Sequence, residues 1–268
     1  MFTVVEDRED LEFEELMEEE TEIRQVHELR FLADLYMQAQ KIRIANENRK
    51  RSLDQGADEG HQAKFLDDLI MRFTDVEDVI TKRMSKAIQL HPTYYWLKHV
   101  KGIGGVLATK LIGYLPQDIE SFSTVSKLWR YCGLAVIDGK AEKNVKGEKS
   151  HFSTKLKTVL YLIATSMIKS RSPYRRIYDD SKAYYTANRP DWTKLRVHYA
   201  SLRKMEKVFI CHLWEVWREA LNLPLRELYV HAKLGHESKF KKEEFVIIPV
   251  PVEPKKRGRK PKVILIEE

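Results

Sequence analysis

The sequence predicts a mostly α-helical fold: a helical hairpin or coiled-coil arm, then a helical domain, then a basic extended tail. Apolar residues recur at three- and four-residue spacing through most of the 268 residues, which is the period of an amphipathic helix. Strand-like runs are minor before residues 245–252, where two prolines indicate an edge strand or an extended segment. We therefore expect an arm over residues 1–90, a domain over 91–240, and an extended or disordered tail over 241–268.

The arm is expected to contain two long helices, at about residues 11–51 and 62–89, joined by a polar loop with two glycines. An apolar stripe runs along the second helix from Phe65 to Ile88. Two such helices form either an antiparallel hairpin packed on a core or the arm of a coiled-coil dimer. Core packing is the simpler interpretation, and we expect a homo-oligomer to form through these helices. The glutamates within residues 14–20 indicate a solvated helix face rather than a metal site.

Residues 100–112 are the most informative stretch and predict a helix, a two-glycine turn and a second helix. Ile103 can anchor the turn, and its glycine neighbours permit the positive-φ backbone that a tight turn needs. The free N–H groups and positive dipole end of the second helix would face a bound phosphate. The pattern resembles the helix-hairpin-helix element that grips a nucleic-acid backbone, and an ordinary glycine-tight hairpin is the alternative. The candidate binding residues here are Lys101, Gly102, Ile103, Gly104, Gly105 and Lys110.

Four further helices are expected in the domain, separated by turn residues. Their expected ranges are 124–132, 154–169, 174–188 and 195–221. Ser123 is a candidate N-cap for the first of them. Residues 138–150 form a lysine-rich loop, which is a flexible hairpin, a DNA-contacting loop or merely a solvated one. The cluster Tyr174, Tyr178, Tyr184 and Tyr185 either packs in the core or stacks nucleic-acid bases.

Charge is divided unequally along the chain. The net charge is +7, but residues 1–93 carry 13 basic and 22 acidic side chains, a net −9, whereas residues 94–268 carry 34 and 18, a net +16. A basic portion segregated in this way indicates a polyanionic partner, and a solvated lysine-rich surface is the alternative. No apolar run reaches the roughly 18 residues of a membrane span, and the acidic N-terminus argues against a secretory signal. Because two cysteines are too few for a disulfide framework, we expect a cytoplasmic protein, nucleoid-associated if prokaryotic.

Further basic residues extend the expected nucleic-acid interface. In the tail, Arg257-Gly258-Arg259 with Pro261 resembles an AT-hook, whose arginines lie in the narrow A·T minor groove. Lys260 interrupts the usual Arg-Gly-Arg-Pro order, so a nuclear-import signal or a general polyanion-binding tail fits equally well. The side chains expected to contact double-stranded DNA are Lys140, Lys143, Lys146, Lys149, Lys155, Lys157, Arg257 and Arg259.

From about His91 to Leu221, the order of these motifs resembles the C-terminal domain of IS110/IS116/IS902-type transposases. Gly102-Ile103-Gly104 matches that family's glycine hairpin. Residues 128–134 (LWRYCGL) match its short helix ending in Gly-Leu, and residues 156–164 (LKTVLYLIA) match its Leu-Arg-x-x-Leu-x-x-Ala helix. The resemblance implies DNA binding in transposition or recombination, or a function derived from it.

The chain also departs from that family. A RuvC-like nuclease half with four metal-binding carboxylates is implied by the resemblance but has no counterpart in residues 1–93. The family's nucleophilic serine, followed by glycine, falls where this chain has Asp138-Gly139, which leaves Ser150 and Ser153 as shifted candidates. We expect no metal site and no cofactor, and Mg²⁺ would matter only for a nuclease activity.

The sequence thus predicts a DNA-binding protein related to these transposases, which grips the phosphate backbone through its glycine hairpin. Whether it is an enzyme stays open. One alternative is an active, divergent serine transposase or recombinase that works with a nuclease supplied in trans. The other is a non-enzymatic assembly or scaffold protein whose acidic arm docks a basic partner.

Overall fold

The computed structural model describes residues 6–53, 61–137, 139–226 and 240–246, of which residues 6–26 are described by their backbone alone. The elements in chain order are α1 (Glu6–Leu53), α2 (His61–Ala87), η1 (Ile88–Leu90), α3 (Tyr94–Leu97), α4 (Gly105–Tyr114), α5 (Val125–Tyr131), β1 (Val136–Ile137), β2 (Lys140–Ala141), α6 (Thr154–Lys169), α7 (Arg175–Asn188), α8 (Lys194–Ala220) and η2 (Lys242–Phe245). The predicted mostly α-helical fold is confirmed. Strands in the described ranges are limited to β1 and β2, which pair antiparallel with Val136 opposite Ala141.

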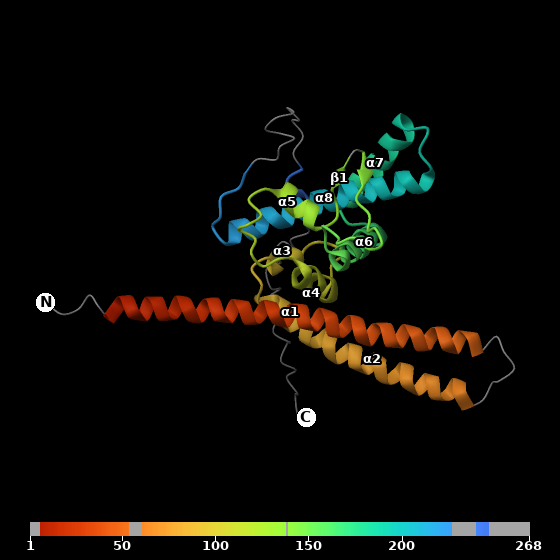
Figure 1. Cartoon of the computed structure of the whole chain (residues 1–268), viewed down its shortest axis with the longest axis horizontal. Coiled ribbons are helices and arrows are strands. Elements are labelled where there is room, and N and C mark those ends of the chain that lie inside the picture. The colour runs from red at the N-terminus through yellow and green to blue at the C-terminus, as the bar shows by residue number, and fades with distance from the viewer. Residues whose placement is uncertain (1–5, 54–60, 138, 227–239, 247–268) are drawn as a thin grey trace, which may run out of the picture.

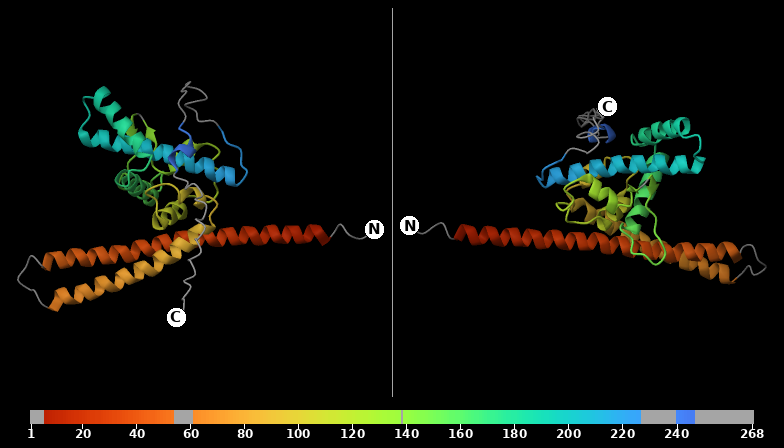
Figure 2. Two further views of the ribbon diagram at one scale, coloured as in Figure 1. Left: turned by 180° about the vertical axis from the view of Figure 1, so that it is seen from behind. Right: turned by 45° about the horizontal axis from the view of Figure 1, so that its top comes forward.

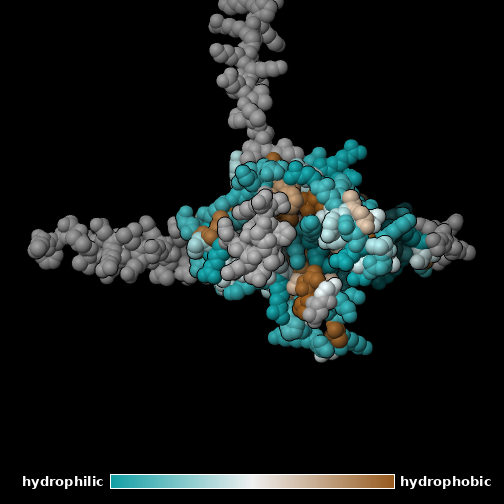
Figure 3. Space-filling view, turned by 90° about the horizontal axis from the view of Figure 1, so that it is seen from above, coloured by the Kyte–Doolittle hydropathy of each residue, from teal (hydrophilic) through white to brown (hydrophobic). Residues whose placement is uncertain are grey.

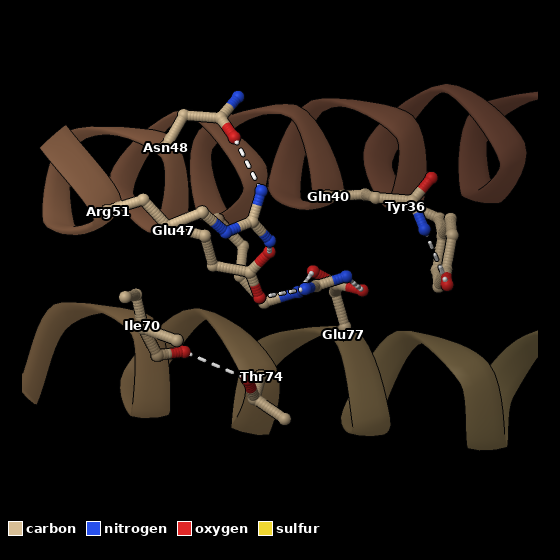
Figure 4. A network of polar contacts seen from close by, with 9 residues as sticks. Tyr36, Gln40, Glu47, Asn48, Arg51, Ile70, Thr74 and Glu77 are labelled. Atoms are coloured by element: carbon tan, nitrogen blue, oxygen red, sulfur yellow. Dashed lines mark hydrogen bonds and ion pairs between the residues drawn. The ribbon is translucent and has the colours of Figure 1, made fainter. Parts of the chain in front are cut away.

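Helices α1 and α2 lie side by side in antiparallel directions and form the arm, and the other helices pack on one side of it (Figures 1 and 2). Arg43 of α1 joins the two helices, because its Nε donates to Glu77 Oε1 of α2 at 2.6 Å and its Nη1 donates to Glu47 Oε1 at 2.6 Å. Figure 4 shows Glu47 and Glu77 facing each other across the two helices. Since Glu77 is almost fully buried, this pair fixes the register of the helices more than it adds to stability.

Helix α4 packs into the junction between the arm and the domain. At Gly113 it crosses α1 so closely that a Cβ there would lie 2.8 Å from the carbonyl oxygen of Leu29. On another side of α4, Thr109 Oγ1 donates to the carbonyl oxygen of Met84 of α2 at 3.2 Å. All residues of α4 from Ala108 to Tyr114 are therefore buried. The middle of α1 and the end of α2 belong to the same hydrophobic core as the domain.

Helix α8 is the central element of the domain. Trp129 of α5 donates its indole N–H to the carbonyl oxygen of Lys207 at 2.9 Å. Trp214 donates to the carbonyl oxygen of Phe122 at 2.7 Å, which ties the loop before α5 to α8. Helix α7 packs along the first half of α8, and the end of this α7–α8 hairpin projects away from the core (Figures 1 and 2).

The structure differs from the sequence-based expectations in two local details. The helix before the glycine turn is a single turn, α3, rather than a longer element. The N-cap of α5 is Thr124, not Ser123, whose hydroxyl instead accepts from Lys127 Nζ at 3.3 Å. Of the tyrosine cluster, Tyr174 and Tyr178 are buried in the core. The expected extended segment, residues 245–252, lies outside the described residues from residue 247 onward.

No helix in the described ranges is long and apolar enough to cross a lipid bilayer. The same residues hold no group of three or more His, Cys, Asp and Glu side chains arranged for a metal ion. Cys132 and Cys211 are free, buried thiols.

Candidate nucleic-acid interface

The glycine turn adopts the backbone that the sequence predicts. Gly102 has a φ of +98°, a conformation that residues with side chains rarely adopt. Ile103 is 8% exposed and packs into the core, so it anchors the turn from below. Gly104 is extended and exposed, and α4 begins at the next residue. The turn is therefore held by the core on one side and presents its backbone to solvent on the other.

The start of α4 offers unpaired backbone donors at this surface. The first backbone hydrogen bond at this end runs from the N–H of Ala108 to the carbonyl oxygen of Gly104, at 3.0 Å. The N–H groups of residues 105–107 therefore precede the helical ladder, at the positive end of the α4 dipole. Lys101 is exposed next to them. This is the arrangement of donors and charge that binds an anion at a helix N-terminus.

Helix α6 supports the turn from behind, a contact that sequence reasoning missed. Ser166 Oγ donates to the carbonyl oxygen of Gly102 at 2.6 Å. A Cβ on Gly102 would lie only 2.6 Å from Ser170 Oγ, so the end of α6 touches the turn directly. Lys169 and Arg171, which flank Ser170, are exposed and add two positive charges to this region. Nothing in their local sequence distinguishes them from other surface basic residues.

Lys110 does not join the candidate interface. Its side chain is 3% exposed, and its Nζ lies 4.2 Å from the centre of the Tyr36 ring of α1. Burial lowers the pKa of Lys110 to about 8. Because the ammonium group is enclosed between α4 and the arm, it cannot reach a ligand at the exposed turn. The sequence suggested the contrary because Lys110 follows the turn closely.

The lysines between residues 140 and 149, in β2 and the loop after it, and those of α6 divide into two groups. Lys140, Lys143, Lys146 and Lys149 are exposed, and no ion pair of theirs is found in the described part of the chain. Lys155 instead pairs with Asp34 of α1 at 2.5 Å. Lys157 donates to the carbonyl oxygen of Glu142 at 2.8 Å and lies over the Phe152 ring. Lys155 and Lys157 thus have structural contacts, whereas the loop lysines remain available to an anionic partner. Arg257 and Arg259 lie outside the described residues.

Comparison with known proteins places the turn and the loop in one family segment. The model of the transposase IS116/IS110/IS902 family matches residues 94–179. This segment is therefore similar to the IS116/IS110/IS902 transposases. It spans α3, the glycine turn, α4, α5, β1, β2, the lysine-rich loop after β2, α6 and the start of α7. No curated protein and no solved structure matches the chain.

Both serines that the family resemblance brought forward make local hydrogen bonds. Ser153 is the N-cap of α6, and its side chain accepts from the N–H of Leu156 at 3.3 Å. Ser150 Oγ donates to the carbonyl oxygen of Phe152 at 2.9 Å and accepts from the N–H of the same residue. In the described ranges, neither hydroxyl contacts a histidine or a carboxylate that would act as a general base.

A cluster of titratable side chains lies beside the family segment's loop and was not foreseen. Burial raises the pKa of Glu206 on α8 to about 7, and the positive charges of Arg203 and Lys157 act in the opposite direction. Burial also lowers the pKa of Lys157 and that of Lys207. Most of these residues lie on α8, outside the matched segment, so their proximity to the loop arises only in the folded chain.

The surface on the side opposite α1 is predominantly hydrophilic where described residues are visible, with small separate apolar patches (Figure 3). A predominantly polar surface suits a hydrated polyanion better than an apolar ligand.

Proposed function

We propose that this protein binds double-stranded DNA by gripping its phosphate backbone at the glycine turn, in DNA transposition or recombination or in a function derived from them. The observation that carries the proposal is the exposed start of α4, where three backbone N–H groups, the helix dipole and Lys101 converge. The family match of residues 94–179 supports DNA as the anionic partner. The proposal places the protein in the cytoplasm, at the nucleoid if the source is prokaryotic, and needs no metal or cofactor in this chain.

The contact region extends from the turn along exposed basic residues. Lys169 and Arg171 adjoin the turn through Ser170, and the loop lysines between residues 140 and 149 lie in the same family segment. Backbone contacts of this type carry little sequence information, so we expect binding to tolerate many sequences. We propose that Arg257 and Arg259 of the tail add minor-groove or backbone contacts to those of the turn and the loop.

Gly104 provides the sharpest test of the proposal. A Cβ on Gly104 would meet no atom within 4 Å, and its φ of −92° suits any residue, so Gly104→Glu leaves the fold unstrained. The new carboxylate lies where the phosphate would bind, and we expect duplex affinity to fall about tenfold or more, since it replaces an attraction by a repulsion. Gln62→Glu on the distant end of α2 adds the same charge and serves as the control. Equal affinities of the two variants in a fluorescence-anisotropy titration would refute the proposal.

A second candidate function, DNA strand transfer through a serine with a nuclease supplied in trans, is favoured by the family match alone. Its test is a covalent protein–DNA adduct trapped on a nicked duplex and lost in Ser150→Ala. Ser153→Ala is less informative, because that change also removes the cap of α6.

We also propose that the arm joins two copies of the chain. The arm exposes large apolar side chains, with Phe31 at 64%, Phe65 at 59% and Val79 at 67%. Exposed apolar side chains that gather on one surface are typical of protein–protein contacts, and both helices of the arm carry them. Sedimentation velocity should then show a dimer, and Phe65→Gln with Val79→Gln should shift it to monomer. Leu195→Gln, an equally exposed apolar change on α8, should leave it unchanged. A monomeric wild-type protein at micromolar concentration would exclude this role of the arm.

A further inference from the structure

A pocket of about 390 Å³ lies at the projecting end of the α7–α8 hairpin, outside the segment that matches the transposase family. Its volume is within the range of about 300–1,000 Å³ that is typical of small-molecule sites. The end of α7, the connecting turn and the start of α8, which project from the domain in Figure 1, carry its lining residues. The lining residues are Lys182, Thr186, Arg189, Pro190, Trp192, Lys194, Val197 and His198.

The charged side chains that line this pocket are all basic, although Asp191 lies in the connecting turn between two of the lining residues. Lys182, Arg189 and Lys194 line it, all three are exposed, and none of them forms an ion pair within the described ranges. No carboxylate is part of the lining. Three cations that converge on one hollow without an acidic partner repel one another, and an anion between them removes that cost.

An aromatic side chain gives the pocket a flat apolar wall. The Trp192 ring lies 5.2 Å from the Tyr185 ring, at an angle of 30° between their planes. The Arg196 guanidinium lies 4.3 Å above the Trp192 ring, and Arg189 approaches it to 5.8 Å. These contacts hold the indole in place. The Arg196 guanidinium covers one face of the ring, and because Arg196 is exposed, a base can displace it and stack on that face.

Two polar side chains add directional contacts. His198 Nδ1 shares a hydrogen bond of 2.8 Å with the hydroxyl of Tyr178, which orients the imidazole and leaves Nε2 for a ligand. Thr186 Oγ1 donates to the carbonyl oxygen of Lys182 at 2.8 Å, so its hydroxyl oxygen remains an acceptor. The pocket therefore combines cations, a ring surface, and both a hydrogen-bond donor and an acceptor.

We propose that this pocket binds a nucleotide, with its phosphate between Arg189, Lys194 and Lys182 and its base against Trp192. A base paired and stacked within a duplex cannot enter a pocket of this size, so the ligand is an unpaired nucleotide. This unpaired nucleotide belongs to a single strand or to the unpaired part of a DNA substrate. The inference in this form rests on the proposed DNA binding. A free mononucleotide offers the same chemistry from another source.

The experiment compares three probes on the full-length chain: a 20-nucleotide thymidine strand, a 20-base-pair duplex and adenosine monophosphate. The pocket variant is Arg189→Gln with Lys194→Gln. Its control is Lys204→Gln with Lys64→Gln, which removes two exposed positive charges elsewhere. We expect the pocket variant to lose about tenfold or more in single-strand affinity relative to the control, and less than about threefold in duplex affinity, because two phosphate contacts are lost only on the unpaired strand.

Trp192 tests the base contact separately. Trp192→Ala should lower single-strand affinity by about five- to 100-fold, which is the effect of losing one base–aromatic stack. Because this change also removes packing against Tyr185, Trp192→Phe is measured beside it and should retain most of the affinity. Melting temperatures of both variants establish that the hairpin is folded.

The outcomes separate this inference from the proposed function. If the pocket variant and the control bind the strand and the mononucleotide equally, the pocket inference is overturned. Duplex binding at the glycine turn can still stand in that case. If the mononucleotide binds in a pocket-dependent way but neither DNA does, the proposed function fails and the ligand is a free nucleotide. Loss of strand binding in the pocket variant alone supports the inference as stated.

Discussion

The hydroxyl of Ser166 donates a hydrogen bond to the carbonyl oxygen of Gly102 at 2.6 Å, although the two residues are 64 positions apart in the chain. Helix α6 thereby holds the glycine turn from which α4 starts. The position of the candidate phosphate-binding amides is thus set by tertiary contact with α6 as well as by the local sequence.

Ser166→Ala removes this bond and leaves the Gly102 carbonyl without its side-chain partner. We expect the free energy of unfolding to fall by about 1 kcal/mol, the usual effect of one such hydrogen bond. Duplex affinity should fall as well, because the turn loses its support. Ser166→Thr keeps the hydroxyl and is the matched control. Urea denaturation and anisotropy titrations measure the two effects, and a Ser166→Ala protein with unchanged stability would contradict this role.

The cap of α6 gives a second prediction. Ser153→Ala should destabilise the protein by about 1 kcal/mol, because the N–H of Leu156 loses its acceptor. Ser153→Asp restores an acceptor at the same position and should recover the stability. If Ser153 were a nucleophile as well, Asp would restore stability but not the covalent adduct, so the two measurements together separate the two roles.

His91 predicts a pH dependence of stability. Burial lowers the pKa of His91 to about 4, from about 6.5 for an exposed histidine. The unfolded chain takes up this proton at a higher pH than the folded chain does. The contribution of His91 is therefore complete above pH 6.5, falls as the pH drops towards 4, and amounts to about 3 kcal/mol.

This dependence can be measured by urea unfolding at pH 7, 5.5 and 4.5. His91→Gln should flatten the decline between pH 6.5 and 4 without abolishing it, because burial also lowers the pKa of His212. His27→Gln, a change at an exposed histidine, should leave the decline as it is. A decline of equal steepness in His91→Gln would show that other groups cause it.

The loop lysines predict the salt dependence of DNA binding. A plot of log affinity against log salt concentration should have a steep negative slope, with about 0.9 units for each neutralised phosphate. Replacing Lys140, Lys143, Lys146 and Lys149 by glutamine should make that slope shallower. The control replaces four exposed basic residues of the arm, Lys41, Lys64, Arg72 and Lys82. An equal change of slope in both variants would mean that the loop makes no specific contribution.

Some elements of this fold could be predicted closely. Helix α6 begins and ends at the predicted residues, since Ser153 caps it and its apolar residues recur at helical spacing. The burial of Lys110 could not be predicted in the same way. Helix α4 is packed on nearly every side by α1, α2 and α6, so its sequence period does not reveal which face is exposed.

The candidate sites also contain some features that the local sequence predicts and others that it does not. Local sequence identified the glycine turn and the lysine loop, because turn geometry and charge are local properties. The contact of Ser166 with Gly102 and the pocket at the end of the α7–α8 hairpin depend on how helices pair, which local sequence does not show. The proximity of Glu206 to Lys157 likewise arises from packing of α8 against α6.

The close crossing of α4 and α1 at Gly113 has a mechanical consequence. Helix α1 is one uninterrupted element of 48 residues, about 70 Å long at 1.5 Å per residue. Because a glycine and a main-chain segment meet there without intervening side chains, little compliance separates the two helices. A displacement of either end of α1 is therefore passed on to α4 at this crossing. The amides at Gly104 and Gly105 then move together with the arm.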